Sequence, residues 1–282
     1  MRKYLILLFT VFVFTTSSAD TSKIKDKFFS SIESYFNSNF EDTEFSFKSK
    51  EGNKPEIGIL TFKPLNENDN GITFFQGSFF THDGDRETLN LGYGKRFFNS
   101  DKSFLYGLNA FYDHELDYDH QRASVGGEIK SSILEFNTNH YFAMSDESSG
   151  KNSVKEEVAD GYDLELGAHV PYIPSAKIFA KIFEYEIPGG SDFEGMEYSS
   201  KIGIPNSGLN IELGFKDFGN ASYNDQCFIN LTFNSNKINK NINFINDKAF
   251  ERISMEDKKY DKVRRENLIV KSKAFSVKAG GF

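Results

Sequence analysis

Four residues around one short connection could, by type, bind a metal ion: Asp113, His114, Asp119 and His120. Carboxylate and imidazole groups are common metal ligands, but the spacing of these four matches no standard ligand pattern. We therefore predict no metal site and no cofactor here. Asn109 and Asp113 are expected to belong to a shared hydrogen-bond network instead.

The residues of a hydrolase triad are also present by type, as Asp163, His169 and Ser199. The GxSxG motif that presents a nucleophilic serine is absent, which argues against this interpretation. The single cysteine, Cys227, has no CxxC partner and lies in an alternating segment, so neither an internal disulfide nor redox chemistry is predicted. The sequence predicts a protein that is not an enzyme.

Ionisable side chains gather on one face of many alternating segments. In residues 161–170, for example, apolar side chains at every second position oppose Asp163, Glu165 and His169. Such alternation indicates strands with one apolar and one polar face. The polar face would be solvated in a soluble sandwich and would line the lumen in a membrane barrel. The candidate lumen residues are Asn109, Asp113, Arg122, Glu128, Glu135, Asp163, Glu165, Lys181, Lys201, Glu212 and Lys216.

The alternation predicts about twelve strands. Their lengths, near ten residues, suit tilted membrane strands better than the shorter strands of soluble proteins. The connections also alternate in length, as in outer-membrane barrels: 131–132 and 171–175 are short, whereas 145–160 and 187–194 are long. The predicted strands are residues 43–50, 56–64, 71–81, 87–98, 103–115, 120–130, 132–144, 161–170, 176–186, 196–204, 208–218 and 222–234.

The N-terminus supports the membrane interpretation. Residues 1–19 have a basic start, an apolar centre and a small-residue end, which is the layout of a secretory signal peptide cut after Ala19. Residues 20–42 follow as an amphipathic helix, which either binds a membrane surface or packs at one mouth of the barrel. The predicted fold is therefore an all-β, twelve-stranded antiparallel transmembrane β-barrel over residues 43–234.

Composition fits this prediction. The 282-residue chain carries a net charge of −8, which disfavours nucleic acid as a partner. Hydrophobic residues make up only 38% of the chain, as expected when half of each barrel strand faces a polar lumen. No run of about 18 apolar residues follows the N-terminus, so no transmembrane helix is predicted.

Alternation stops after Asn234, and residues 235–282 form a tail or linker, for which the family resemblance given below implies a path through the lumen. Residues 258–265 are basic, which by itself indicates a solvated segment or a lipid headgroup contact. Cations of this linker are expected to face lumen carboxylates such as Glu128, Glu165 and Glu212. The candidate linker residues are Tyr260, Arg264, Arg265 and Asn267.

Several motifs resemble one family. They are LNLGYGKRFF (89–98), YGLNAFYDHEL (106–116), SVGGE (124–128), NHYFAMSD (139–146), GYDLELGAHVPYIP (161–174), KIFEYE (181–186) and YDKVRRENLIVK (260–271). Together they resemble the β-domain of inverse autotransporters, the intimin/invasin family, over residues 35–271. The resemblance implies a twelve-stranded barrel in the Gram-negative outer membrane with a periplasmic N-terminus. It also implies type V secretion, in which the linker threads the lumen and displays a C-terminal adhesive passenger.

The resemblance implies partners as well: outer-membrane lipids and lipopolysaccharide, periplasmic chaperones, and the barrel-assembly machinery, which would read the aromatic end of the last strand. We expect a monomer, and the sequence names no host or cell-surface receptor. No Ig-like domain of about 100 residues fits in residues 272–282. The expected function is thus translocation or anchoring of the C-terminal segment at the cell surface. A passengerless porin-like channel and a surface interaction protein remain the alternatives.

Overall fold

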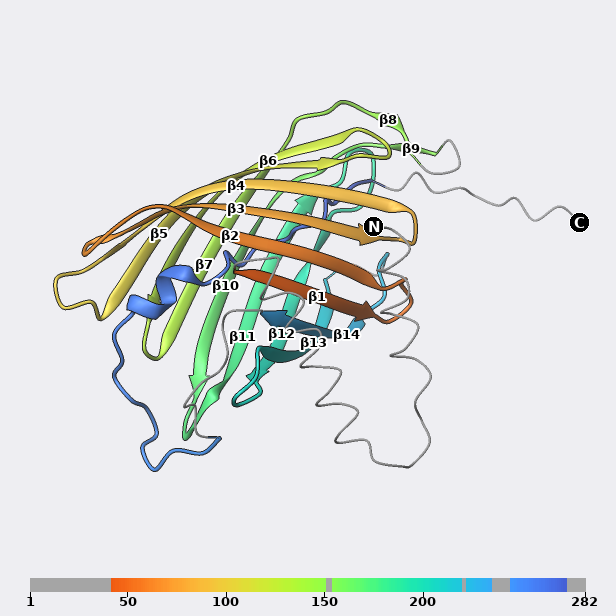
Figure 1. Cartoon of the computed structure of the whole chain (residues 1–282). Coiled ribbons are helices and arrows are strands. Elements are labelled where there is room, and N and C mark those ends of the chain that lie inside the picture. The colour runs from red at the N-terminus through yellow and green to blue at the C-terminus, as the bar shows by residue number, and fades with distance from the viewer. Residues whose placement is uncertain (1–41, 151–153, 220–221, 235–243, 273–282) are drawn as a thin grey trace, which may run out of the picture. The chain divides into compact units, whose positions relative to one another are not determined.

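Twelve antiparallel strands close into one barrel (Figure 1). The computed structural model describes residues 42–150, 154–219, 222–234 and 244–272. The predicted fold, a twelve-stranded antiparallel barrel, is confirmed. The strands are β1 (Thr43–Lys50), β2 (Glu56–Asn68), β3 (Gly71–His82), β4 (Arg86–Phe98), β5 (Phe104–Glu115), β6 (His120–Ser131), β7 (Leu134–Ala143), β10 (Asp160–Val170), β11 (Ile173–Glu186), β12 (Phe193–Gly203), β13 (Leu209–Phe218) and β14 (Gln226–Asn234).

Each predicted strand has its counterpart, and the bounds differ by a few residues. The long connection between β7 and β10 holds a small additional hairpin, β8 (Ser148–Ser149) and β9 (Lys155–Glu156), which the sequence did not predict. The predicted signal peptide and the helix of residues 20–42 lie outside the described residues, apart from Asp42. No helix in the described ranges is long and apolar enough to cross a membrane.

The barrel closes where the first strand meets the last. β1 pairs with β14 from Glu44–Asn234 to Lys50–Phe228. Every strand pairs antiparallel with its neighbour, so the sheet of the barrel has no open edge along this seam, as a lipid environment requires. We call the end where β1 begins and β14 finishes the terminal end, and the opposite end the loop end.

Side chains alternate between the outside and the lumen. On β5, Leu108 is 65% exposed on the outside, whereas Asp113 is fully buried inside. Phe111 breaks the simple pattern because it is an apolar residue on the lumen face, where it packs with Phe74 and Val263 in one buried cluster. The lumen is therefore partly aromatic. The exposed outer band includes Leu91, Tyr93, Val125, Leu134, Leu166, Ile178, Tyr198, Leu213 and Ile229.

The C-terminal segment passes through the barrel from one end to the other (Figure 1). At the terminal end, the Met255 amide donates to the Lys102 carbonyl (2.9 Å), and the 3₁₀ helix η2 (Glu256–Tyr260) follows. Near mid-height, the Val263 amide donates to Gln76 Oε1 (2.9 Å). At the loop end, the Ser272 amide donates to the Glu157 carbonyl (2.9 Å). We call residues 256–272 the lumen segment.

Candidate functional site

The centre of the site is a buried ion pair between the lumen segment and β5. Arg265 donates through Nη1 and Nη2 to both carboxylate oxygens of Asp113, at 2.8 and 2.6 Å. Arg122 of β6 binds the same carboxylate through Nε at 2.9 Å, and Asn90 of β4 adds a hydrogen bond at 2.9 Å. Both side chains of the Arg265–Asp113 pair are 0% exposed. Two guanidinium groups therefore converge on one fully buried carboxylate.

Lumen glycines make room for the aromatic rings beneath these cations. A Cβ on Gly92 of β4 would overlap the ring of Phe111, so the ring lies flat against the strand only because position 92 is glycine. The Arg265 guanidinium lies over that ring, 4.3 Å from its centre. Arg96 lies in the same way over Phe74, at 4.7 Å. Cation–π contacts of this kind favour arginine over other residues at these positions.

Polar side chains of β3 to β7 also bind the backbone of the lumen segment. Gln76 accepts from the Val263 amide, and Arg122 donates to the carbonyl oxygens of Glu266 (2.7 Å) and Leu268 (3.1 Å). Backbone contacts do not depend on the identity of the bound residue, so this wall can hold an extended chain in general. The side chains that bind backbone groups here are Gln76, Asn90, Arg96, Arg122, Asn139 and Tyr141.

Arg264 binds the opposite side of the lumen. It donates to both oxygens of Glu165 on β10 (2.6 and 2.9 Å) and to Glu212 on β13 (3.0 Å). Its guanidinium also lies 3.8 Å from the centre of the Phe179 ring. The side chain of Arg264 is 24% exposed, unlike that of Arg265. Successive residues of the lumen segment thus bridge two walls of the barrel.

At the terminal end, the entry of the lumen segment is fixed by exposed or half-buried pairs. Tyr260 donates to Glu67 (2.7 Å), Lys259 pairs with the same carboxylate (2.6 Å), and Lys262 donates to the Asp42 carbonyl (3.0 Å). Because solvent screens such contacts, they fix position more than they add stability.

At the loop end, five charged or ionisable residues form one buried network. Arg86 binds Glu115 (2.5 Å) and Glu156 (2.6 Å), and His120 hydrogen bonds to Glu156 through Nε2 (3.0 Å). Lys271 of the lumen segment pairs with Glu115 and lies 3.6 Å from Glu156. The network ties the end of the lumen segment to the long loop between β7 and β10.

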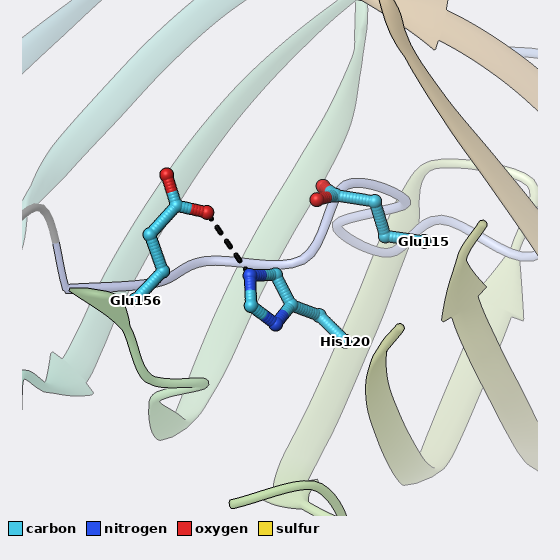
Figure 2. Close-up of side chains that lie close together, drawn as sticks. All are labelled: Glu115, His120 and Glu156. Carbon is cyan, nitrogen blue, oxygen red and sulfur yellow. Dashed lines mark hydrogen bonds and ion pairs between the residues drawn. The ribbon is translucent and has the colours of Figure 1, made fainter. Parts of the chain in front are cut away.

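The same network holds the best metal-like geometry in the described ranges. Figure 2 shows Glu115, His120 and Glu156 directed toward one another, and their ligand atoms all lie within 4.8 Å. Arg86 and Lys271 already balance the two carboxylates, and His120 Nδ1 contacts Ser148 Oγ at 3.0 Å. A metal ion would have to displace these cations. The five residues already form a salt-bridge network in which each carboxylate is paired with a cation.

The electrostatics of Glu156 depend on these partners. Burial alone would raise the pKa of its carboxyl group, but hydrogen bonds from Arg86 and His120 and the charge of Lys271 hold the pKa below its ordinary value. The network therefore favours the ionised form of Glu156. Alongside it, backbone hydrogen bonds link Ala159 to Val270 (3.0 Å) and Ser272 to Glu157. We call the network and these backbone bonds the exit clasp.

The remaining sequence candidates line the lumen in separate groups. Glu135 pairs with Lys177, and Glu197 pairs with Lys181 (2.9 Å) and Lys216 (3.3 Å). Lys201 lies opposite Lys177 and Glu212 in the strand register. Asp163 accepts hydrogen bonds from Asn139 and Tyr141, both at 2.7 Å. The Asn267 carbonyl accepts from Asn90 at 2.8 Å.

Two expectations about individual residues are wrong. Glu128 does not face a linker cation: it binds Arg96 (2.5 Å) and Lys130 (3.1 Å), which both come from the wall. Asn109 lies outside the network of Asp113: within the described part of the chain its buried Oδ1 has no hydrogen-bond partner. Four residues along a strand separate the two side chains by roughly 13 Å, too far for a shared bond.

The residues that suggested other chemistry are dispersed. His114 pairs with the exposed Asp119 (2.7 Å), away from the buried Asp113 and His120. Ser199 donates to Glu212 (2.7 Å), and within the described residues no hydrogen bond joins it to His169. Asp113, His114, Asp119 and His120 therefore do not converge on a zinc site, and Asp163, His169 and Ser199 do not form a catalytic triad.

Sequence reasoning missed several residues of the site: Arg86, Arg96, Glu115, Tyr141 and Glu156. The alternation of each strand would have identified three of them. Arg96 lies two residues after Gly94, so it faces the lumen as that glycine does. Glu115 lies two residues after Asp113, and Tyr141 lies two residues after Asn139, so both also face the lumen. Arg86 lies at the edge of the barrel and Glu156 lies in a long loop, and the alternation of the strands extends to neither position.

Comparison with known proteins agrees with this geometry. The family model described as the inverse autotransporter beta-domain matches residues 14–267. The chain belongs to this family. An Intimin from Escherichia coli O111:H- is 30% identical over 127 residues, which are 44% of this chain and 13% of that protein. A putative attaching and effacing protein homolog from Escherichia coli K12 is 31% identical over 135 residues, 47% of this chain and 43% of that protein.

A solved chain from a study of the in-meso crystallization of membrane proteins has the same fold. It superposes with a TM-score of 0.64 at 20% identity, and the match covers 82% of this chain and 99% of that one. This inverse autotransporter barrel is an outer-membrane protein, surrounded by membrane lipid. It matches less than half of the length of the two relatives above.

Proposed function

We propose that the barrel anchors the chain in the outer membrane and guides its C-terminal segment through the lumen to the cell surface. The terminal end would face the periplasm and the loop end the outside. Support comes from one observation above all: the lumen segment contacts the wall at the terminal end, at mid-height and at the loop end, through Tyr260, Arg265 and Lys271.

The chemistry of the lumen suits this role. The guanidinium groups of Arg264 and Arg265 meet carboxylates on opposite walls, while side chains of β3 to β7 bind backbone groups. A lumen that recognises both charge and backbone holds its own linker in a fixed register. It also lets other extended chain pass, because backbone recognition does not require a particular sequence.

The proposal includes the family's route of assembly and its partners. Periplasmic chaperones and the barrel-assembly machinery would insert a monomer among phospholipid and lipopolysaccharide. The intimin and the attaching and effacing homolog among the relatives favour a role related to adhesin export. The lumen groups would bind and position the chain, without a catalytic step.

An epitope fused after Phe282 tests this function. We expect antibody to label the epitope on intact cells and to label it no better after the outer membrane is permeabilised. The control carries the same epitope in the turn between β10 and β11, at the terminal end, and should react only after permeabilisation. An epitope at 282 that behaves like the control would refute the proposed threading direction.

A further inference from the structure

Before it enters the lumen, the C-terminal chain runs along the terminal end of the barrel (Figure 1). We call residues 244–255 the rim segment. The rim segment is hydrogen bonded to Tyr172 between β10 and β11, to Ser132 between β6 and β7, and to Lys102 between β4 and β5. The Asn246 amide, for example, donates to the Tyr172 carbonyl at 2.8 Å. These turns therefore fix the rim segment at the edge of the barrel.

The rim segment exposes four large apolar side chains. Phe244 and Ile245 are 51% and 71% exposed, and Phe250 and Ile253 are 42% exposed each. Met255, where the segment turns into the lumen, is by contrast fully buried. Apolar side chains gathered on an exposed surface mark a binding site for a protein partner or for a membrane. The rim segment therefore presents a docking surface.

The barrel wall beside the rim segment carries an aromatic girdle on its outer face. Phe97, near the end of β4, stacks on Tyr106 of β5 at 5.5 Å, and Tyr106 stacks on Phe104 at 6.3 Å. The two β5 residues share the outward face of Leu108. Aromatic girdles mark the membrane–water interface in outer-membrane barrels. Because β5 begins just after Lys102, which binds the rim segment, that segment lies at the level of the interface.

The apolar side chains of the rim segment continue the lipid-facing surface of the barrel. Ile253 is hydrogen bonded to Ser132 Oγ through both its amide and its carbonyl, each at 3.1 Å. The next two residues of that turn, Ile133 and Leu134, are exposed, and Leu134 belongs to the outer band of the barrel. Tyr172, the contact of the rim segment in another turn, is 52% exposed. Membrane lipid that surrounds the outer band therefore reaches the rim segment.

Charged side chains alternate with the apolar ones. The exposed charged residues of the rim segment are Asp247, Lys248, Glu251 and Arg252. So many charges exclude the hydrocarbon core of the membrane, but they suit the headgroup boundary, where apolar side chains insert and charged groups stay in water. The centre of a protein–protein interface, by contrast, is depleted of charged residues. The pattern thus favours a lipid surface over a protein partner.

We infer that the rim segment is an interfacial anchor that binds the phospholipid surface at the terminal end of the barrel. Its four apolar side chains enter the boundary between headgroups and acyl chains, and its charged side chains stay among the headgroups. Because the rim segment leads into the lumen at Met255, lipid binding holds the entry of the lumen segment at the membrane surface. The inference goes beyond the proposed display function, since it concerns a lipid contact outside the barrel wall and holds for either direction of threading.

The chain contains no tryptophan, so a single introduced indole reports only its own surroundings. The full-length chain with Phe250→Trp is reconstituted in vesicles of phosphatidylethanolamine and phosphatidylglycerol, with and without phospholipid brominated on its acyl chains. Leu213→Trp, on the outer face of β13, is the lipid reference. Lys155→Trp, in the long loop between β7 and β10, is the aqueous reference. We expect the brominated lipid to quench Phe250→Trp several-fold more than Lys155→Trp, and acrylamide in the water to quench it less.

Ile245→Trp repeats the measurement at a second exposed position of the rim segment. Quenching by acrylamide as strong as for Lys155→Trp at both positions would overturn the inference, because the segment would then lie in water. Protection from both quenchers would overturn it as well, since a protein surface or a second copy of the chain would then cover the segment. Neither result would affect the epitope test of display, so the two proposals can fail separately.

Hydrogen exchange in the same vesicles gives a second readout. Phe250→Ser/Ile253→Ser removes two apolar side chains of the rim segment, and Asp247→Ser/Lys248→Ser is the matched polar control. Residues 244–255 should exchange several-fold faster in the apolar variant and at the parent rate in the polar one. Unchanged exchange in both variants, or equal acceleration in both, in protein that keeps heat-modifiable gel mobility, would contradict the lipid anchor.

Discussion

The two sides of the lumen treat the same segment in opposite ways. The gripping wall, the lumen face of β3 to β7, buries Asp113 and Arg265 completely and binds backbone groups of the segment at several points. The vestibule wall, the lumen face of β11 to β14 and β1, borders much of a cavity of about 370 Å³ beside the segment. One wall fixes the register of the segment and the other leaves space beside it.

This asymmetry separates two tasks that the proposed function requires. A fixed register requires desolvated contacts in which each buried charge meets an opposite charge, because an unpaired buried charge is costly. Passage of chain or solute requires a wet surface that makes no tight contact. The adjacent residues Arg264 and Arg265 show the division, since one is 24% exposed on the vestibule side and the other is fully buried on the gripping side.

The largest effect is expected at the gripping wall from Asp113→Leu. The substitution leaves Arg122 and Arg265 buried and facing each other, which should cost about 3–5 kcal/mol. The measurement is the urea midpoint of the heat-modifiable folded band in micelles. Asp119→Asn, at an exposed carboxylate of the loop end, is the control and should stay within about 0.5 kcal/mol of the parent. Equal shifts in the urea midpoint for Asp113→Leu and Asp119→Asn would show that the buried carboxylate contributes no more to stability than the exposed one.

The second prediction compares Arg265→Met with Arg264→Met, the same change at neighbouring positions. Loss of the buried pair with Asp113 should cost about 1.5–3 kcal/mol, the range for hydrogen bonds to charged groups. Loss of Arg264 should cost less, because water from the cavity can solvate Glu165 and Glu212. Limited proteolysis of the lumen segment gives the readout. If proteolysis cuts the lumen segment faster in Arg264→Met than in Arg265→Met, this prediction is wrong.

The third prediction concerns the ring that supports Arg265. Gly92→Val should displace Phe111 and destabilise the barrel by about 1–3 kcal/mol, as overpacking does. Gly127→Ala is the matched control, because its added Cβ would meet Thr138 Cγ2 at an ordinary 3.5 Å. In a double-mutant cycle, Gly92→Val and Arg265→Met should be non-additive, since both act on one stack. Strict additivity would show that the ring does not position the guanidinium.

The exit clasp should weaken in acid. Because the pKa of Glu156 is lower in the folded barrel than the ordinary value of about 4.3, its stabilising contribution is present above that value and is lost as pH falls through the folded pKa. Hydrogen exchange at the Ala159 and Ser272 amides, corrected for intrinsic rates, should lose protection in that window. Glu156→Gln should lose protection already at pH 7. Protection unchanged in both cases would argue against the clasp.

The smallest effect is expected on the vestibule wall. Thr232→Val removes a hydroxyl that has no hydrogen-bond partner among the described residues, so the unfolding free energy should change by less than about 0.5 kcal/mol. The same urea midpoint measures it. A loss of unfolding free energy as large as that of Arg265→Met would mean that the vestibule wall also binds the lumen segment tightly.

The sequence predicted the strands well because the alternation of polar and apolar residues can be seen within a single strand. It does not depend on which strand lies beside it. The predicted strands 208–218 and 222–234 correspond to β13 and β14, which begin one and four residues later. The alternation also pointed to Asp113 as a lumen residue, and the basic run and the family resemblance pointed to Arg264 and Arg265 as residues of the linker. The register between strands, which decides partners, is not local, so the pairing of Glu128 with Arg96 could not be predicted.

Three features depended on geometry that no single segment contains. An aromatic cluster joins Phe183 of β11, Phe193 of β12 and Phe218 of β13 with Tyr223 of the loop before β14, and in the sequence each of these residues by itself is unremarkable. Phe111 appeared as an exception to its strand until Gly92 on the neighbouring strand explained it. Glu156 joins the exit clasp from a long loop, where sequence periodicity gives no guidance.

Photo-crosslinking from inside the barrel tests the central claim, that the lumen segment lies between the two walls. A benzophenone amino acid at position 179 would replace a ring that lines the cavity and contacts Arg264 at 3.8 Å, so the added group has room. In intact cells, irradiation should join position 179 to the peptide containing Arg264, and mass spectrometry would identify it. Crosslinks to barrel strands alone, in protein that keeps heat-modifiable mobility, would contradict the account.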